Sequence, residues 1–197
     1  MTAPSWFLGG KRLCLASASP RRRDLLAQAG VPCRVQPVEV DESPLPEEKA
    51  ESYVTRLARA KALAIGPIAE ELVLGADTVV VLDEVLLGKP ASPEEARATL
   101  RLLGGRDHRV LTGVAVWRPA DGAVRECIVE SRVWFKDLTE EEIAAYVDCG
   151  EPLDKAGSYG LQGVGAFLVA RLEGSCSGVA GLPLCESLAL LQELAWS

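Results

Sequence analysis

Blocks of apolar residues alternate along the chain with polar, glycine- and proline-rich segments, and this pattern predicts strands and helices in turn. The apolar run Leu13–Ala16 predicts a strand. The residues from Pro20 to Gly30 repeat apolar positions at helical spacing and predict a helix, with Ser19 suited to the N-cap. The chain therefore opens with a strand, a tight turn and a helix.

The same criteria predict the other elements of the chain. Those of the first half are a short strand within Cys33–Val38, an acidic loop at Asp41–Glu48, a helix ending near Gly66-Pro67 with Tyr53, Leu57, Ala60, Ala64 and Ile65 on one face, a buried strand over Leu72–Leu82 and a hairpin strand at Val85–Leu87. Those of the second half are a helix from Ser92 or Pro93 to Leu103, strands at Val110–Trp117 and Val124–Phe135, a helix from Thr139 to Asp148, a strand at Ala166–Ala170 and a helix over Leu184–Leu194.

Strands and helices alternate in the first half, and a hairpin lies in the middle of the chain, so we expect a mixed sheet covered by helices. The predicted fold class is α/β. No internal repeat or flexible linker interrupts the sequence, which favours a single domain over residues 1–197. Because ligands in such folds bind at the carboxyl ends of strands, the turn Ser17–Arg22 is the first place to look for a site.

Composition places the protein among folded globular chains. Of its 197 residues, 48% are hydrophobic and 25% are charged, which excludes disordered, collagen-like and coiled-coil proteins. The formal net charge of -7 argues against a protein that coats nucleic acid through a basic surface. An anionic ligand must therefore be bound by a local group of cations.

The cysteines, the histidine and the lengths of the apolar runs further limit the class of protein. The six cysteines include no C-x-x-C pair, so we expect reduced thiols and no structural zinc site. His108, the only histidine, follows a turn and is predicted to be a surface residue without a role. No basic segment precedes an apolar run at the N-terminus, and no run reaches eighteen apolar residues. The expected location is the cytoplasm, with no membrane contact.

The turn before the first helix carries the first candidate chemistry. Ser17, Arg21 and Arg22 lie where backbone N–H groups and the helix dipole favour an anion. Guanidinium groups bind phosphate oxygens in pairs, so the turn suits a polyphosphate. The alternative is a solvated basic turn, because neighbouring arginines point in different directions around a helix.

Asp77 is the second candidate, because it interrupts an apolar strand. A carboxylate in such a place is costly unless it is paired or bound to a metal. Its partner is Lys61, Lys89, or a divalent cation shared with Glu42 and one of the acidic residues near Glu42. The alternative to a functional group is a buried structural ion pair.

A polar, glycine-rich segment from Glu151 to Gly163 is the third candidate. It suits a loop that closes around a ligand, and Gln162 offers an amide donor and acceptor to the edge of a base. By itself the segment is equally consistent with an ordinary loop.

Six segments together resemble the Maf family of nucleotide pyrophosphatases, and the resemblance runs from about Leu13 to the end of the chain. In family order and spacing they are LASASPRR (Leu15–Arg22), YVTRLARAKA (Tyr53–Ala62), GADTVV (Gly75–Val80), GKP (Gly88–Pro90), GEPLDKAGSYGLQG (Gly150–Gly163) and GLPL (Gly181–Leu184).

The resemblance implies an elongated, ITPase-like α/β fold with two lobes around a cleft. It also implies hydrolysis of a nucleoside triphosphate to the monophosphate and pyrophosphate with Mg²⁺ or Mn²⁺. Asp77 matches the family's proton acceptor, and Ser17, Arg21 and Arg22 match its phosphate-binding turn. Glu42, Lys61, Lys89 and Gln162 match the other polar positions, with Glu42 and Asp77 as metal ligands.

Substrate choice also follows from the resemblance. Arg21, Thr78 and Gln162 agree with the subgroup that acts on dTTP and UTP, and these residues are expected to contact substrate. A sister subgroup acting on 7-methyl-GTP has S-D-Q at positions 76–78 and Glu at position 162, which this sequence lacks.

Two alternatives stay open at this stage. One is a nucleotide-binding regulator of cell division without significant catalysis, which would not need Asp77. The other is an enzyme of the same chemistry that cleans modified or non-standard nucleotides from the pool. The family likeness also leads us to expect a homodimer.

Overall fold

A computed structural model describes residues 8–66 and 71–197 of the chain. Its strands are β1 (Arg12–Leu15), β2 (Arg34–Val35), β3 (Glu71–Leu82), β4 (Val85–Leu87), β5 (Asp107–Arg118), β6 (Ala123–Phe135) and β7 (Val169–Glu173). Its α-helices are α1 (Pro20–Gln28), α2 (Ala50–Ala64), α3 (Pro93–Leu103), α4 (Glu140–Asp148), α5 (Cys176–Val179) and α6 (Leu184–Trp196). Short 3-10 helices η2 (Glu151–Asp154), η3 (Ala156–Ser158) and η4 (Val164–Leu168) fill the glycine-rich segment.

The chain divides into two compact units, and the long strands β3, β5 and β6 contribute residues to both. Unit 1 contains residues 1–77, 112–129 and 181–197, and unit 2 contains residues 78–111 and 130–180. In the part of the chain that the structure describes, the strands form one seven-stranded sheet with parallel and antiparallel pairs. The predicted α/β class with a mixed sheet is confirmed. The single domain and the cleft between two lobes stay predictions.

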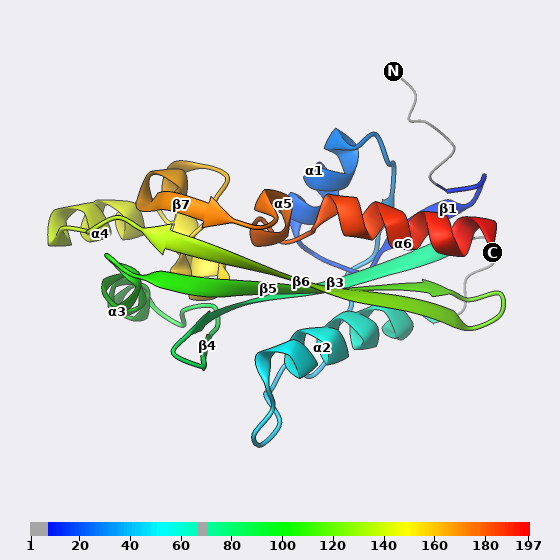
Figure 1. Ribbon diagram of the computed structural model, residues 1–197, viewed down its shortest axis with the longest axis horizontal. Helices are drawn as coiled ribbons and strands as arrows, with labels where there is room; N and C mark the ends of the chain where they lie inside the picture. The colour runs from blue at the N-terminus through cyan, green and yellow to red at the C-terminus, as the bar shows by residue number, and fades with distance from the viewer. Residues whose placement is uncertain (1–7, 67–70) are drawn as a thin grey trace. The chain divides into compact units, whose positions relative to one another are not determined.

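Unit 1 is built on parallel pairing of β1 with β2 and with β3. Helix α2 covers one face of these strands and α6 the other (Figure 1). Ala58 and Ala62 of α2 pack with buried Cys14, Val73 and Ala115 of the strands. Small side chains on both sides of this contact bring the helix close to the sheet.

Two glycines of the sheet face α2 where no side chain fits. A Cβ atom at Gly75 would lie 2.3 Å from the Ala58 carbonyl oxygen, and one at Gly113 would lie 2.5 Å from that of Val54. Both obstacles are helix backbone, which cannot move aside as a flexible side chain can. The strands therefore need glycine at these two positions.

Unit 2 has its own apolar core. In this unit β4 pairs antiparallel with β3, and β7 pairs antiparallel with β6. Helices α3 and α4 lie against each other. Helix α4 begins with the predicted capping box, in which Thr139 and Glu142 bond each other's backbone N–H. The core gathers Val80, Leu82, Leu100, Leu103, Val110, Val133, Phe135, Ile143, Tyr146 and Leu168, among others.

Three expectations from the sequence are corrected. The strand predicted at Ala166–Ala170 begins later, because η4 occupies residues Val164–Leu168 and the register with β6 pairs Arg132 with Glu173. The buried face of α2 is Ala50, Val54, Leu57, Ala58, Lys61 and Ala62, so the predicted face shares only Leu57 with it. Ser19 holds the N-cap position of α1, but its side chain makes no capping hydrogen bond.

His108 is the fourth correction, because it is buried. It is only 2% exposed, lies within β5, and shares a hydrogen bond of 2.8 Å with the Tyr159 hydroxyl through Nε2. Its ring also meets those of Phe135 and Tyr159 edge-on. Residues of β5 alternate in burial at this point, which turns His108 and Val110 inward and Asp107 and Arg109 outward.

The six cysteines lie within the described residues and are all free thiols, as expected. None of the helices that the described residues form combines the length and apolar character needed to span a bilayer.

Candidate active site

The centre of the candidate site is a lysine held between two carboxylates. The Lys61 ammonium nitrogen lies 2.7 Å from Asp77 Oδ1 and 2.6 Å from Glu42 Oε1. Lys61 comes from the buried face of α2 and Asp77 from the buried strand β3. The close approach at Gly75, two residues before Asp77, brings the helix and strand near enough for this contact. Of the two lysines that the sequence left open as partners of Asp77, Lys61 forms the ion pair.

Burial and the neighbouring cations act in opposite directions on the pKa of Asp77. The residue is only 8% exposed, and this loss of solvent raises the pKa of its carboxyl above the usual value. The nearby cations Lys61 and Arg22 oppose the rise, and Glu42 adds to it. A carboxylate with a raised pKa is a stronger base than a solvated one, which suits proton acceptance.

Ser17 and Arg22 meet at the start of α1. Arg22 Nη1 donates to Ser17 Oγ at 3.1 Å, and the Ser19 backbone N–H donates to the same oxygen at 3.2 Å. Arg22 Nε donates to the Gly181 carbonyl oxygen at 2.8 Å, which fixes the guanidinium against the segment before α6. Gly181 belongs to the GLPL motif, which thereby gains a structural role that sequence reasoning did not assign.

Electrostatics connects this turn with the carboxylates. Loss of solvent lowers the pKa of Arg22, while Asp77 and Glu42 raise it. An arginine stays charged at neutral pH even so, because its reference pKa is far above 7. The serine, the arginine and the Lys61 cluster therefore form one polar group within unit 1.

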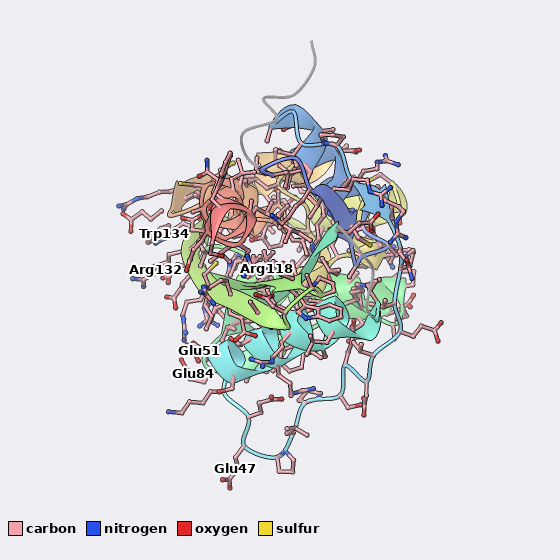
Figure 2. The ribbon with its side chains drawn as sticks, turned by 90° about the vertical axis from the view of Figure 1, so that its right-hand side faces the viewer. Glu47, Glu51, Glu84, Arg118, Arg132 and Trp134 are labelled. Atoms are coloured by element: carbon pink, nitrogen blue, oxygen red, sulfur yellow. The ribbon has the colours of Figure 1, made fainter. Side chains whose placement is uncertain are left out.

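Glu42 stands on the loop between β2 and α2, which Figure 2 shows extended away from the sheet with Glu47 at its tip. Two contacts tie this loop to α2. The Tyr53 hydroxyl donates to the Glu42 carbonyl oxygen at 2.9 Å, and Arg56 bonds both carboxylate oxygens of Glu48 at 2.7 Å. An exposed loop residue is thus held against the buried Lys61.

Tyr53 is a site residue that sequence reasoning missed, because the helical spacing predicts it on an apolar helix face. Burial, Asp77 and Glu42 together raise the pKa of its hydroxyl to about 12. At neutral pH it is therefore a reliable donor. Its spacing of eight residues from Lys61 on one helix is the signal that places both on nearby faces.

The other predicted residues are placed as follows. Arg21 is half-buried beside Arg22, and its charge lowers the pKa of Arg22. Thr78 follows Asp77 in β3 and is half-buried. Lys89 and Gln162 belong to unit 2, where both are exposed, the first after β4 and the second between η3 and η4. Unit 1 therefore brings together Ser17, Arg22, Glu42, Lys61 and Asp77.

Glu42 and Asp77 are the carboxylates of the site that could bind a divalent cation. Glu42 and Asp77 both direct a carboxylate oxygen at the Lys61 ammonium, which shows that their charges converge on one position. Carboxylate oxygens are the ligands that Mg²⁺ and Mn²⁺ prefer, and Mg²⁺ commonly takes one or two of them together with substrate phosphates. Residues 8–66 and 71–197 contain no group of three or more acidic, histidine or cysteine side chains placed to hold a metal. The pair fits a cation that arrives with its substrate.

Comparison with known proteins shows the family of the chain. A family model described as Maf-like protein matches residues 12–194. A dTTP/UTP pyrophosphatase of Hahella chejuensis is 46% identical over 196 residues, covering 96% of both chains. One of Myxococcus xanthus is 51% identical over 181 residues and 91% of both chains. One of Vibrio cholerae is 47% identical over 184 residues, covering 92% of this chain and 97% of the relative.

Proposed function

The chain belongs to the family of Maf-like proteins, and we propose that it is a nucleoside triphosphate pyrophosphatase acting on dTTP and UTP. Water attacks the α-phosphorus, the bond to the β-phosphate bridging oxygen breaks, and the nucleoside monophosphate and pyrophosphate leave. This is hydrolysis of an acid anhydride. The relatives in three genera carry the name of this activity.

The observation that carries the proposal is the buried Asp77, paired with Lys61 in a cluster that also includes Ser17 and Arg22. A regulator that only binds nucleotide needs cations for the phosphates. It does not need a desolvated carboxylate among them, because such a group repels the ligand. Hydrolysis needs both, a base for water and cations for the charge that develops on phosphate oxygens.

Each side chain of the cluster has a role in this scheme. Asp77 orients the water and accepts its proton. Arg22 and Ser17, with Arg21 beside them, bind non-bridging phosphate oxygens at the start of α1, where backbone N–H groups add to the attraction. Lys61 keeps Asp77 ionised in the ground state and offsets the charge of the leaving pyrophosphate. Lys89, Thr78 and Gln162 are predicted to bind the rest of the substrate.

The proposal includes Mg²⁺ or Mn²⁺, which Glu42 and Asp77 would hold. When bound, the cation supplies Lewis-acid stabilisation of phosphate charge and makes a coordinated water more acidic. Glu42 and Asp77 would supply the protein's carboxylate ligands to that cation. A homodimer and a cytoplasmic location stay predictions of the sequence.

The test is pyrophosphate release from dTTP, UTP, CTP, dATP, GTP and 7-methyl-GTP, with magnesium or manganese present and absent. We expect release from dTTP and UTP. Asp77→Asn keeps the size of the side chain but removes the base, and turnover should fall by at least about a hundredfold. Asp148→Asn, which alters an exposed carboxylate at the end of α4, should match the wild type.

Near-native turnover by Asp77→Asn would remove Asp77 from the role of base. No pyrophosphate from any nucleotide, with the protein folded and binding dTTP, would favour the regulator instead. Release from all six nucleotides at similar rates would favour the broader enzyme that cleans the nucleotide pool.

A further inference from the structure

The residues that follow Gln162 are bound to one carboxylate. The backbone N–H of Val164 donates to Glu151 Oε2 at 2.9 Å, and that of Gly165 donates to Glu151 Oε1 at 3.1 Å. Glu151 opens η2, thirteen residues before Val164, and it is half-buried. Its side chain therefore fixes the chain on the C-terminal side of Gln162.

The residues before Gln162 reach the same carboxylate through a tyrosine. The backbone N–H of Gly160 donates to the Tyr146 hydroxyl oxygen at 3.1 Å, and this hydroxyl donates to Glu151 Oε1 at 2.9 Å. Burial raises the pKa of Tyr146, so its proton stays in place at neutral pH. Glu151 thus anchors both ends of the segment Leu161–Gly163.

Glycines allow the segment to lie against these anchors. Gly163 has φ of 116°, and a Cβ atom there would lie 2.6 Å from Glu151 Oε2. A Cβ atom at Gly165 would lie 2.3 Å from the Tyr146 hydroxyl oxygen. Side chains at either position would push the carboxylate or the phenol away from its partners.

A buried lysine holds the main chain of Glu151 as well. Lys155 is 8% exposed, and its ammonium donates to the Glu151 carbonyl oxygen and, at 2.7 Å, to Asp154 Oδ1. The side chain and the backbone of Glu151 are therefore both fixed. All of these contacts lie within unit 2.

We propose that Glu151 is a positioning residue that sets base discrimination by holding Gln162 in one orientation. The inference rests on the proposed function. A glutamine amide carries a donor and an acceptor that rotation interchanges. Thymine and uracil present an N3–H donor and an O4 acceptor, whereas cytosine presents the reverse pair. A fixed backbone presents the Gln162 amide to the base from one position, which favours one of the two patterns, and a mobile backbone lets the amide adapt to both.

The variant that tests this is Glu151→Gln, which keeps the shape of the side chain. Three donors point at the carboxylate, and an amide has one oxygen, so at least one of them would face an N–H₂ group. We expect the ratio of kcat/KM for dTTP to that for CTP to fall about fivefold or more, the size of one hydrogen bond. KM for dTTP should rise while kcat changes little, because base binding is the same in the ground and transition states.

Two controls separate positioning from a general loss of structure. Glu141→Gln alters an exposed carboxylate on α4 and should leave the ratio unchanged. Gln162→Ala should lower the ratio by itself, and adding Glu151→Gln to it should then have no further effect. Hydrogen exchange of the backbone amides of 160–165 should be faster in Glu151→Gln than in the wild type.

Each outcome decides between the claims. If the wild type releases no pyrophosphate from dTTP or UTP, the proposed function fails and this inference fails with it. If the wild type discriminates and Glu151→Gln keeps the same ratio, only the inference is overturned. Independent, multiplicative effects of Glu151→Gln and Gln162→Ala would also overturn it, because Glu151 would then act by a route other than Gln162.

Discussion

Asp77 is a charged residue in a strand whose other positions are mostly apolar and buried, and its neighbours make that tolerable. Lys61 at 2.7 Å compensates the charge, and Arg22 contributes from farther away. Glu42 is different, because it stands on an exposed loop and reaches Lys61 from there. Its position depends on the contacts that tie the loop to α2, and the Tyr53 hydroxyl makes the one at Glu42 itself.

Tyr53→Phe removes only the hydroxyl that donates to the Glu42 carbonyl oxygen. If Glu42 helps to hold the cation, its looser placement should raise the magnesium concentration for half-maximal pyrophosphate release by roughly fivefold, about one hydrogen bond. Turnover at saturating magnesium should stay within about twofold of the wild type. Leu45→Ala in the same loop, an exposed side chain, serves as the control. An unchanged magnesium requirement would show that Tyr53 does not position Glu42 for metal binding.

At the scale of elements, the contact between α2 and β3 positions the site. Lys61 and Asp77 face each other because Ala58, Ala62 and Gly75 leave almost no space between the helix and the strand. A substitution in this contact should therefore affect stability and activity together, although it touches no catalytic atom.

Gly75→Ala tests this contact. The new methyl group would meet helix backbone at 2.3 Å from the Ala58 oxygen and 2.6 Å from the Ala62 nitrogen. We expect the free energy of unfolding, measured in urea, to fall by about 2–3 kcal/mol, and turnover to fall because Lys61 moves with α2. Gly88→Ala adds a methyl group where no atom lies within 4 Å, and its unfolding midpoint should change little. Equal midpoints for the two variants would contradict the close packing.

At the scale of the whole molecule, the free energy of unfolding includes a contribution from His108, which belongs to unit 2 and takes no part in the proposed chemistry. His108 is buried against Tyr159 and Phe135 in the core of unit 2, and burial lowers the pKa of its imidazole from 6.5 to about 4. The Asp107 carboxylate raises this pKa and so offsets only part of the lowering that burial causes. The folded protein keeps the imidazole neutral in a pH range where the unfolded chain binds a proton.

The free energy of unfolding should therefore fall as pH decreases from about 6.5 to about 4, because only the unfolded state gains a proton there. The loss from His108 is on the order of 3 kcal/mol across that range. His108→Gln cannot titrate, so the stability difference between wild type and variant should shrink as pH falls from 7 to 4.5. Urea unfolding of both proteins at several pH values measures this difference. The contributions of the carboxylates cancel in it, because both chains contain them. A difference that stays constant with pH would mean that His108 titrates in the folded protein as it does in the unfolded chain.

Sequence reasoning was most informative where a polar or charged side chain interrupts an apolar sequence pattern. Asp77 in an apolar strand and three arginines after a strand are anomalies that periodicity alone reveals. It failed for His108, because the polar residues Arg106 and Asp107 predict a turn. In the structure, Asp107 and Arg109 alternate with the buried His108 and Val110, as a half-buried strand requires. It missed Tyr53 and Glu151 because their roles depend on hydrogen bonds to distant backbone atoms.

The sequence by itself determined the α/β class, most of the elements and the family, because local periodicity, capping residues and motif spacing are properties of the chain order. Only the tertiary structure decided which cation pairs with Asp77, which face of α2 is buried and where β7 begins. The reason is physical. Each of these depends on packing and strand register between segments far apart in the chain, and many arrangements share the same local pattern.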